Sequence, residues 1–197
     1  MFRKTATRLE ALRTRYADPA RAYHGQRHID MLLALHAELR QHLIAPDAVE
    51  AAIWYHDAIY LPLNSHNERD CAALLRADLH GLADPSLIET AATLVLATSS
   101  HAIPPGIAPA IAADCAWFLD MDLSILGADP AIFAWYNAAI RIEYAAVPEA
   151  EWRARRPHVL GTFLARERLY FTDHFHTLHD AQARRNLRAA IAALAGC

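Results

Sequence analysis

The sequence predicts an all-α protein on three observations: apolar residues recur at helical spacing, alanine supplies much of the apolar content, and glycine is scarce. Hydrophobic residues make up 54% of the 197 residues, and only 6 residues are glycine. Alanine is the strongest helix former, and no segment shows the strict alternation typical of strands. A chain of this length can bury one core without staples, so we expect a single-domain helical bundle.

Prolines, glycines and capping side chains between the periodic segments predict the helix boundaries. The expected stops are Asp18-Pro19, Pro46, Leu61-Pro62-Leu63-Asn64, Gly81, Pro104-Pro105-Gly106 and Gly127, and the expected starts are Asp47, Pro85-Ser86 and Asp129-Pro130. The predicted helices cover residues of about 3–16, 27–43, 47–60, 66–80, 85–96, 108–119, 130–145, 149–170 and 173–195. Nothing repeats at a fixed period and no low-complexity linker divides the chain, which favours one domain.

Charge and composition exclude several classes of partner. The net charge of -3 gives no reason to expect a nucleic acid polymer. No apolar run approaches the roughly 20 residues that span a bilayer, and the first residues carry charges where a signal peptide has its apolar part. The 3 cysteines form no CxxC pair, which is typical of a reducing compartment. We therefore expect a cytoplasmic protein without a membrane partner, whose alanine-rich helical surface is compatible with a homodimer.

A His-Asp pair interrupts the strongly apolar segment AAIWYHDAIY at residues 51–60. Burying His56 and Asp57 there is costly, because a buried carboxylate needs a partner, and a divalent cation is one such partner. Earlier in the chain His24 and His28 stand four residues apart at the start of a predicted helix, with His28 beside its apolar stripe. Taken alone, the His-Asp pair is more often a hydrogen-bonded core pair than a metal site.

The joint pattern of His28, then His56-Asp57, then Asp120-Met121-Asp122 changes the balance in favour of a metal site. Imidazole nitrogen and carboxylate oxygen together suit Mn, Fe, Ni, Co, Zn or Mg. Because the set contains no sulfur, a closed structural zinc site is disfavoured and open positions are left for water.

This ordered pattern resembles the HD-domain metal-dependent phosphohydrolase superfamily, whose signature is H…HD…D, and is most similar to its bacterial group of predicted phosphohydrolases. The matching segments span almost the whole chain and are YHGQRHI (23–29), AAIWYHDAIY (51–60), NERDCAALL (67–75), ATSSH (97–101), FLDMDLSILG (118–127), IRIEY (140–144) and ARRNL (183–187). The resemblance implies one HD-type domain over residues 1–197, with a metal-binding helical core at about 20–130 and C-terminal helices at about 130–195 packing on it.

Carried over residue by residue, the resemblance makes His28 the first ligand, His56 and Asp57 the central pair, and Asp122 the fourth ligand. Asp120 stays in reserve, because residues two apart in a helix point to nearly opposite sides and only one of the two aspartates can reach the ion. We prefer Asp122, since in related domains this ligand opens the segment that leads into the following apolar helix.

Superfamily members with two metals place a further histidine where this chain has Asn67, so we expect one ion, with His66 as the alternative second ligand. Glu68 is the candidate general base or water-orienting group, and Asp57 joins it in the predicted catalytic set. As a plain alternative, Glu68 is a first-turn charge facing the helix dipole. The residues predicted to bind substrate are His24, Arg27, His101 and Arg141, the last of which is equally well explained as a structural ion pair beside Glu143 and Tyr144.

The resemblance implies a metal-dependent phosphohydrolase that uses metal-activated water on a small phosphate ester, with nucleotides among the candidates. A second hypothesis is a non-catalytic sensor module that binds a metal and a nucleotide. A third is a di-iron oxidase, against which the absence of any ExxH pair counts.

Overall fold

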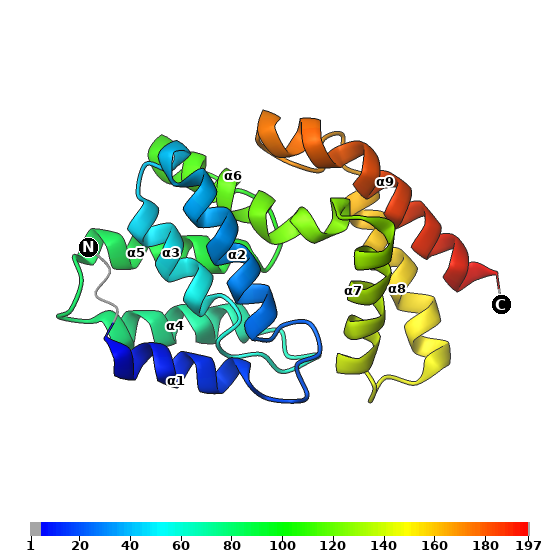
Figure 1. The fold of residues 1–197 in the computed structure, drawn as a ribbon, viewed down its shortest axis with the longest axis horizontal. Coiled ribbons are helices and arrows are strands. Elements are labelled where there is room, and N and C mark those ends of the chain that lie inside the picture. Colours follow the sequence, from blue (N-terminus) through cyan, green and yellow to red (C-terminus); the bar gives the residue numbers. More distant parts are fainter. Residues whose placement is uncertain (1–4, 197) are drawn as a thin grey trace. The chain divides into compact units, whose positions relative to one another are not determined.

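The computed structural model describes residues 5–196, and every regular element among them is a helix (Figure 1). The prediction of an all-α protein is therefore confirmed. The α-helices are α1 (Ala6–Tyr16), α2 (Gln26–Leu39), α3 (Pro46–Tyr55), α4 (Asn67–Leu79), α5 (Pro85–Ala97), α6 (Pro109–Leu123), α7 (Pro130–Glu143), α8 (Glu149–Leu164) and α9 (Asp173–Ala195), and two short 3-10 helices are η1 (Arg40–His42) and η2 (Ser124–Gly127). None of the helices in the described part of the chain has the length and apolar character needed to cross a bilayer.

The predicted boundaries differ most from the observed ones at four C-terminal helix ends. Helices α2, α3, α6 and α8 end at Leu39, Tyr55, Leu123 and Leu164, where the sequence predicts residues 43, 60, 119 and 170. The predicted start of the first helix at residue 3 lies outside the described residues. The residues before and after each of these ends have similar helix propensity. Contacts from elsewhere in the chain therefore determine where the helices end.

The helices form two compact units, one up to Met121 and one from Asp122 onward. In the first unit α3 packs on α2, α4 and α5, and every residue from Ala48 to Tyr55 is buried. A helix that is apolar all round belongs at the centre of a core, and this is how AAIWY is used. The assignment of the whole chain to a single domain stays a prediction.

The segment just before α3 is held by a distant part of the chain. The sequence predicts Asp47 as the N-cap, but Ala45 holds that position without a side-chain capping bond, and Asp47 instead pairs with Arg40 at 2.8 Å. The buried carboxylate of Asp114 on α6 accepts hydrogen bonds from the backbone N–H groups of Ile44 and Ala45, each at 2.7 Å. These bonds fix the entry to the helix from about 70 positions away, which local sequence cannot predict.

The second unit packs α9 against α8, α7 and η2. Gly127, the predicted stop, ends η2 where α9 passes close to the backbone. A Cβ at this position would lie 2.5 Å from the Cβ and 2.8 Å from the carbonyl oxygen of His179, so no side chain fits. Close packing against α9 therefore explains this glycine.

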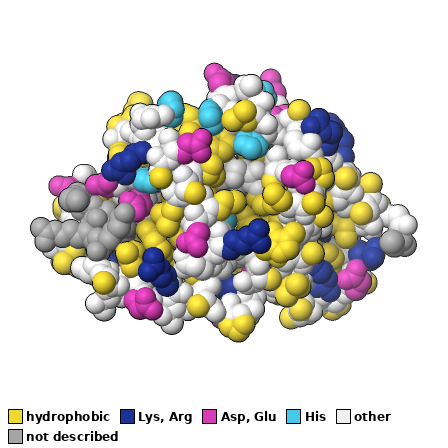
Figure 2. Space-filling view, viewed as in Figure 1, with side chains coloured by type: hydrophobic (Ala, Val, Ile, Leu, Met, Phe, Trp, Pro, Cys, Tyr) yellow, Lys and Arg dark blue, Asp and Glu magenta, His cyan; other side chains and the backbone are white. Residues whose placement is uncertain are grey.

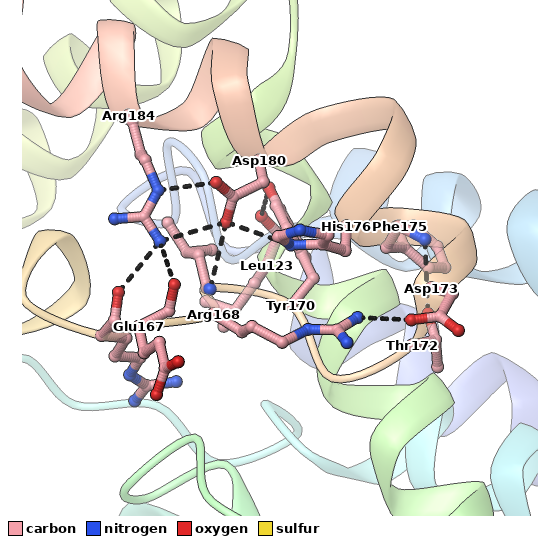
Figure 3. Close-up of polar contacts among 12 residues, drawn as sticks. Leu123, Glu167, Arg168, Tyr170, Thr172, Asp173, Phe175, His176, Asp180 and Arg184 are labelled. Atoms are coloured by element: carbon pink, nitrogen blue, oxygen red, sulfur yellow. Dashed lines mark hydrogen bonds and ion pairs between the residues drawn. The ribbon is translucent and has the colours of Figure 1, made fainter.

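The segment between α8 and α9 is held by two side chains of α9, Asp180 and Arg184 (Figure 3). Arg184 donates to the carbonyl oxygens of Leu164, Arg166 and Glu167 at 2.9–3.1 Å, and its Nε donates to Asp180 at 2.6 Å. The Asp180 carboxylate also accepts from the backbone N–H of Leu169 at 3.1 Å. These bonds take up the carbonyls that a longer α8 would use, so the helix ends at Leu164.

Asp180 makes the stability of this unit depend on pH. Burial opposes its ionisation, but the hydrogen bonds from Arg184 and from the Leu169 N–H outweigh burial and lower its pKa below the usual value. Since the folded-state pKa lies below the unfolded one, the stabilisation is complete above the unfolded pKa of about 4 and is lost as the pH falls through the folded pKa.

We expect Asp180→Asn to reduce the free energy of unfolding by about 1–3 kcal/mol at pH 7, because the Arg184 guanidinium and the Leu169 N–H lose a charged acceptor. The difference from the wild-type protein should shrink below pH 4. Urea unfolding at pH 7, 5 and 3 measures it. The control is Asp173→Asn on the same helix, an exposed partner of Arg168, which should have little effect at any pH. A difference that stays constant down to pH 3 would contradict the explanation.

Among the described residues, the Lys and Arg side chains on the face shown in Figure 2 are scattered among hydrophobic and acidic ones. That distribution is in keeping with the small negative net charge of the chain.

Candidate metal centre

Three of the predicted ligands come together in the structure. His28, His56 and Asp122 each offer one ligand atom, and these atoms all lie within 4.8 Å of one another. His28 lies in the first turn of α2, His56 directly follows α3, and Asp122 is in the last turn of α6, so the position of its side chain follows from that helix. Both histidines are buried and Asp122 is half-buried. Such a group can hold a metal ion.

The two histidines face each other through the same ring atom. Nε2 of His28 lies 3.1 Å from Nε2 of His56. Nδ1 of His56 lies 3.0 Å from the carbonyl oxygen of Ile53, and because a carbonyl can only accept, Nδ1 carries the proton. In neutral His56 the lone pair is therefore on Nε2, the orientation that a second hydrogen bond usually fixes in metal-binding histidines.

The carboxylate of Asp57 completes this arrangement. Its Oδ2 lies 3.0 Å from Nε2 of His56 and 3.7 Å from Nε2 of His28. Electron-rich atoms at such distances need a proton or a cation between them. Two ligands about 2.1 Å from one ion are about 3.0 Å apart in octahedral and about 3.4 Å apart in tetrahedral geometry, so the spacing fits a shared divalent ion.

The electrostatics of Asp57 favour its charged form. Burial opposes ionisation, but without a metal the protonated forms of His56 and His24, and a hydrogen bond from that form of His56, outweigh burial and hold the pKa of Asp57 well below its usual range. The site therefore presents a carboxylate rather than a carboxylic acid at neutral pH. A carboxylate among imidazole nitrogens is a ligand set for a cation of intermediate hardness.

The His-Asp pair lies just beyond a helix and not inside one, which corrects the predicted continuation of α3 to residue 60. Helix α3 ends at Tyr55, and His56 is its C-cap. Asp57 is free of helical geometry, so its side chain can turn toward the same point as His56. Asp122 is also placed differently from the prediction, because α6 continues through it to Leu123, whereas the sequence predicts that the helix ends at residue 119 and that Asp122 opens the segment after it.

Side chains from α1 and the loop before α2 hold the chain around the His-Asp pair. The hydroxyl of Tyr16 donates to the carbonyl oxygen of Trp54 at 3.0 Å. The guanidinium of Arg21 donates to the carbonyl oxygens of Asp57 at 2.6 Å and Ala58 at 3.3 Å. Burial raises the pKa of Tyr16, so its hydroxyl stays a donor. The sequence predicted no role for Tyr16 or Arg21. The one sequence signal is that Arg21 stands three residues before His24.

Two side chains of α4 hold the next part of the same turn. The Cys71 thiol accepts from the Ile59 N–H at 3.2 Å and donates to the Ile59 carbonyl oxygen at 3.3 Å. Burial raises the pKa of Cys71 to about 12, which keeps the proton on sulfur. The amide of Asn67 bonds the N–H and the carbonyl oxygen of Leu61 at 3.1 and 3.0 Å. Asn67 therefore has a structural role. From the sequence, Asn67 is named only as the residue that stands where two-metal members of the superfamily have a histidine.

The residues predicted to bind substrate or to orient water lie on several different elements. The ring of His24 stacks on that of Tyr60 at 4.1 Å between centroids. Arg27 is exposed on α2, and Glu68 is half-buried in the first turn of α4 and is not part of the ligand group. His101 follows α5 with a positive φ of 46°, an uncommon backbone conformation that histidine tolerates. The catalytic and substrate-binding roles of these residues stay predictions.

Two further residues named from the sequence lie outside the ligand group. Asp120 is fully buried, and the ligand group contains Asp122 and not Asp120. Arg141 belongs to the second unit, where it donates to the carbonyl oxygens of Tyr144 and Val147 and to Glu149, with its guanidinium 5.3 Å from the centre of the Trp152 ring. These contacts hold the turn between α7 and α8, and substrate binding by Arg141 stays a prediction.

Comparison with family models, curated proteins and solved structures found no match to this chain. The resemblance to the HD-domain superfamily therefore rests on the ordered residues and segments given above.

Proposed function

We propose that the protein is a metal-dependent phosphohydrolase that acts on a small phosphate ester, with nucleotides as the first candidates. The observation that carries the proposal is the meeting of His28 and His56 with two carboxylates: Asp57 Oδ2 lies 3.0 and 3.7 Å from their Nε2 atoms, and Asp122 forms a candidate metal group with the same two histidines. This arrangement has the residue types and the chain order of the H…HD…D signature, and the resemblance supplies hydrolysis as its use.

The four side chains would hold one divalent ion, with Mn, Fe, Ni, Co, Zn and Mg as the candidates. Such an ion lowers the pKa of bound water and polarises a phosphoryl oxygen. The hydrogen bond from His56 Nδ1 to Ile53 fixes the ring so that Nε2 points into the site. Glu68 is the proposed water-orienting carboxylate, and His24, Arg27 and His101 are the proposed contacts to the phosphate.

Metal removal tests the proposal directly. We expect elemental analysis of the purified protein to give about one divalent ion per chain. Chelation should abolish phosphate release from a panel of nucleotides and phosphate esters, and at least one of the six candidate metals should restore it. Full metal occupancy without turnover on the panel would contradict the proposal. Tight binding of a nucleotide that mass spectrometry finds intact would assign the site to a sensor module instead.

A further inference from the structure

We infer that Arg21 is a positioning residue of the metal centre, acting through the backbone of the two chain segments that carry the ligands. The inference rests on the proposed function only in that it requires the ligand set to bind a divalent ion, and it does not depend on the reaction. Arg21 approaches the ligand segments through backbone oxygens alone, so its effect would be indirect.

The guanidinium of Arg21 joins two segments that are distant in sequence. Nη1 donates to the carbonyl oxygen of His24 at 3.3 Å and to that of Asp57 at 2.6 Å, and Nη2 donates to that of Ala58 at 3.3 Å. His24 lies four residues before the ligand His28, in the turn that leads into α2, and Asp57 follows the ligand His56 directly. One side chain therefore sets the distance between the first ligand segment and the central pair.

The surroundings of Arg21 fix its orientation. Its guanidinium carbon lies 5.5 Å from the ring centre of Tyr16 and 5.9 Å from that of Tyr60. The two aromatic rings fix the orientation of the planar guanidinium group. An ammonium group is not planar, so the rings could not orient it in the same way. A lysine could keep the charge between these rings, but a single nitrogen could not reach three carbonyl oxygens in the same geometry.

The Asp57 carbonyl needs such a donor because it lies outside regular structure. Helix α3 ends at Tyr55, so no following helical N–H is available to Asp57. With its carbonyl oxygen bound to Arg21 at 2.6 Å, the side chain of Asp57 points toward the two Nε2 atoms. Without Arg21, water would satisfy the carbonyl and the residue could rotate away. Outer partners of metal ligands commonly change affinity by about 10- to 100-fold.

The test uses Co²⁺ binding to the full chain. Calorimetry gives the affinity, and the visible absorption of bound Co²⁺ reports the ligand geometry. We expect Arg21→Gln to weaken Co²⁺ binding about 10- to 100-fold and to change the spectrum, and Arg21→Lys to fall between it and the wild-type protein. The control Arg40→Gln removes a half-exposed arginine that pairs with Asp47 at 2.8 Å, and it should bind Co²⁺ like the wild type. Circular dichroism and thermal melting of the metal-free variants check the fold.

A folded Arg21→Gln variant with wild-type affinity and spectrum would overturn the inference. If that variant does not fold, Arg21→Lys decides, because unchanged affinity and spectrum in it would also overturn the inference. Wild-type protein that binds Co²⁺ but releases no phosphate would refute hydrolysis and leave the role of Arg21 standing. Wild-type protein that binds no Co²⁺ would refute the ligand set and the inference together.

Discussion

Replacing His56 by alanine is expected to abolish metal-dependent phosphate release, with a loss of about 1000-fold or more. His56 supplies the Nε2 atom that lies 3.1 Å from His28 and 3.0 Å from Asp57, so its removal leaves the other ligands without their common neighbour. A loss of this size corresponds to about 4 kcal/mol of transition-state stabilisation, in the range that a metal supplies. Asp57→Asn should have a comparable effect, because it keeps the shape of the side chain and removes its charge.

The measurement is phosphate release at saturating metal, together with metal content after dialysis. The control is His66→Ala, which removes an exposed imidazole whose Nδ1 lies 3.5 Å from the Ser65 hydroxyl oxygen. This variant should keep its metal and its activity if one ion binds. Loss of one ion from two in His66→Ala would disprove the single-metal assignment. Full activity in His56→Ala would remove this histidine from the site.

Asp114→Ala is expected to reduce the free energy of unfolding by about 2–4 kcal/mol. The substitution leaves the N–H groups of Ile44 and Ala45 without their acceptor at the start of α3. Each lost bond to a charged group costs about 1.5–3 kcal/mol, and partial access of water reduces the sum.

Urea unfolding of the metal-free protein measures this effect without a contribution from metal binding. Asp114→Asn is the matched variant, because one oxygen remains as an acceptor while the amide nitrogen faces the second N–H. It should be destabilised by less than Asp114→Ala. If both variants unfold within about 0.5 kcal/mol of the wild type, the carboxylate does not stabilise the start of α3.

The apolar run before the His-Asp pair illustrates what the sequence can predict. Ala51, Ala52 and Tyr55 belong to a pattern that is apolar on all sides, and such a helix has to be central because every face needs burial. The same reasoning places His56 near the core, where a polar group needs a partner. Local pattern was enough for both predictions.

The end of α3 illustrates what local pattern could not predict. The residues after Tyr55 have ordinary helical propensity, and the helix stops because Arg21, Asn67 and Cys71 bind the backbone of the following turn. Those partners are up to 36 positions away from the atoms that they bind, and the choice among competing hydrogen bonds is made by tertiary packing. The hydrogen bonds from Ile44 and Ala45 to Asp114 have the same origin.

The pair of aspartates on α6 lies between these cases. Helical geometry requires that Asp120 and Asp122 point to nearly opposite sides, so the sequence predicts that only one can join the histidines. The preference for Asp122 agrees with the group that the structure brings together. The reason given for it does not, because α6 continues through Asp122 to Leu123 and the aspartate ends a helix.

The clamped turn after α3 has a thermodynamic consequence. Ordering a metal site costs conformational entropy, and in small zinc domains that cost is met by the metal, so the chain is unfolded without it. Here Tyr16, Arg21, Asn67 and Cys71 order the ligand segment through protein contacts alone. The entropy is lost when the chain folds, and the free energy of ion binding is left for affinity. Loss and uptake of the ion can then proceed as an exchange on a folded protein, governed by mass action.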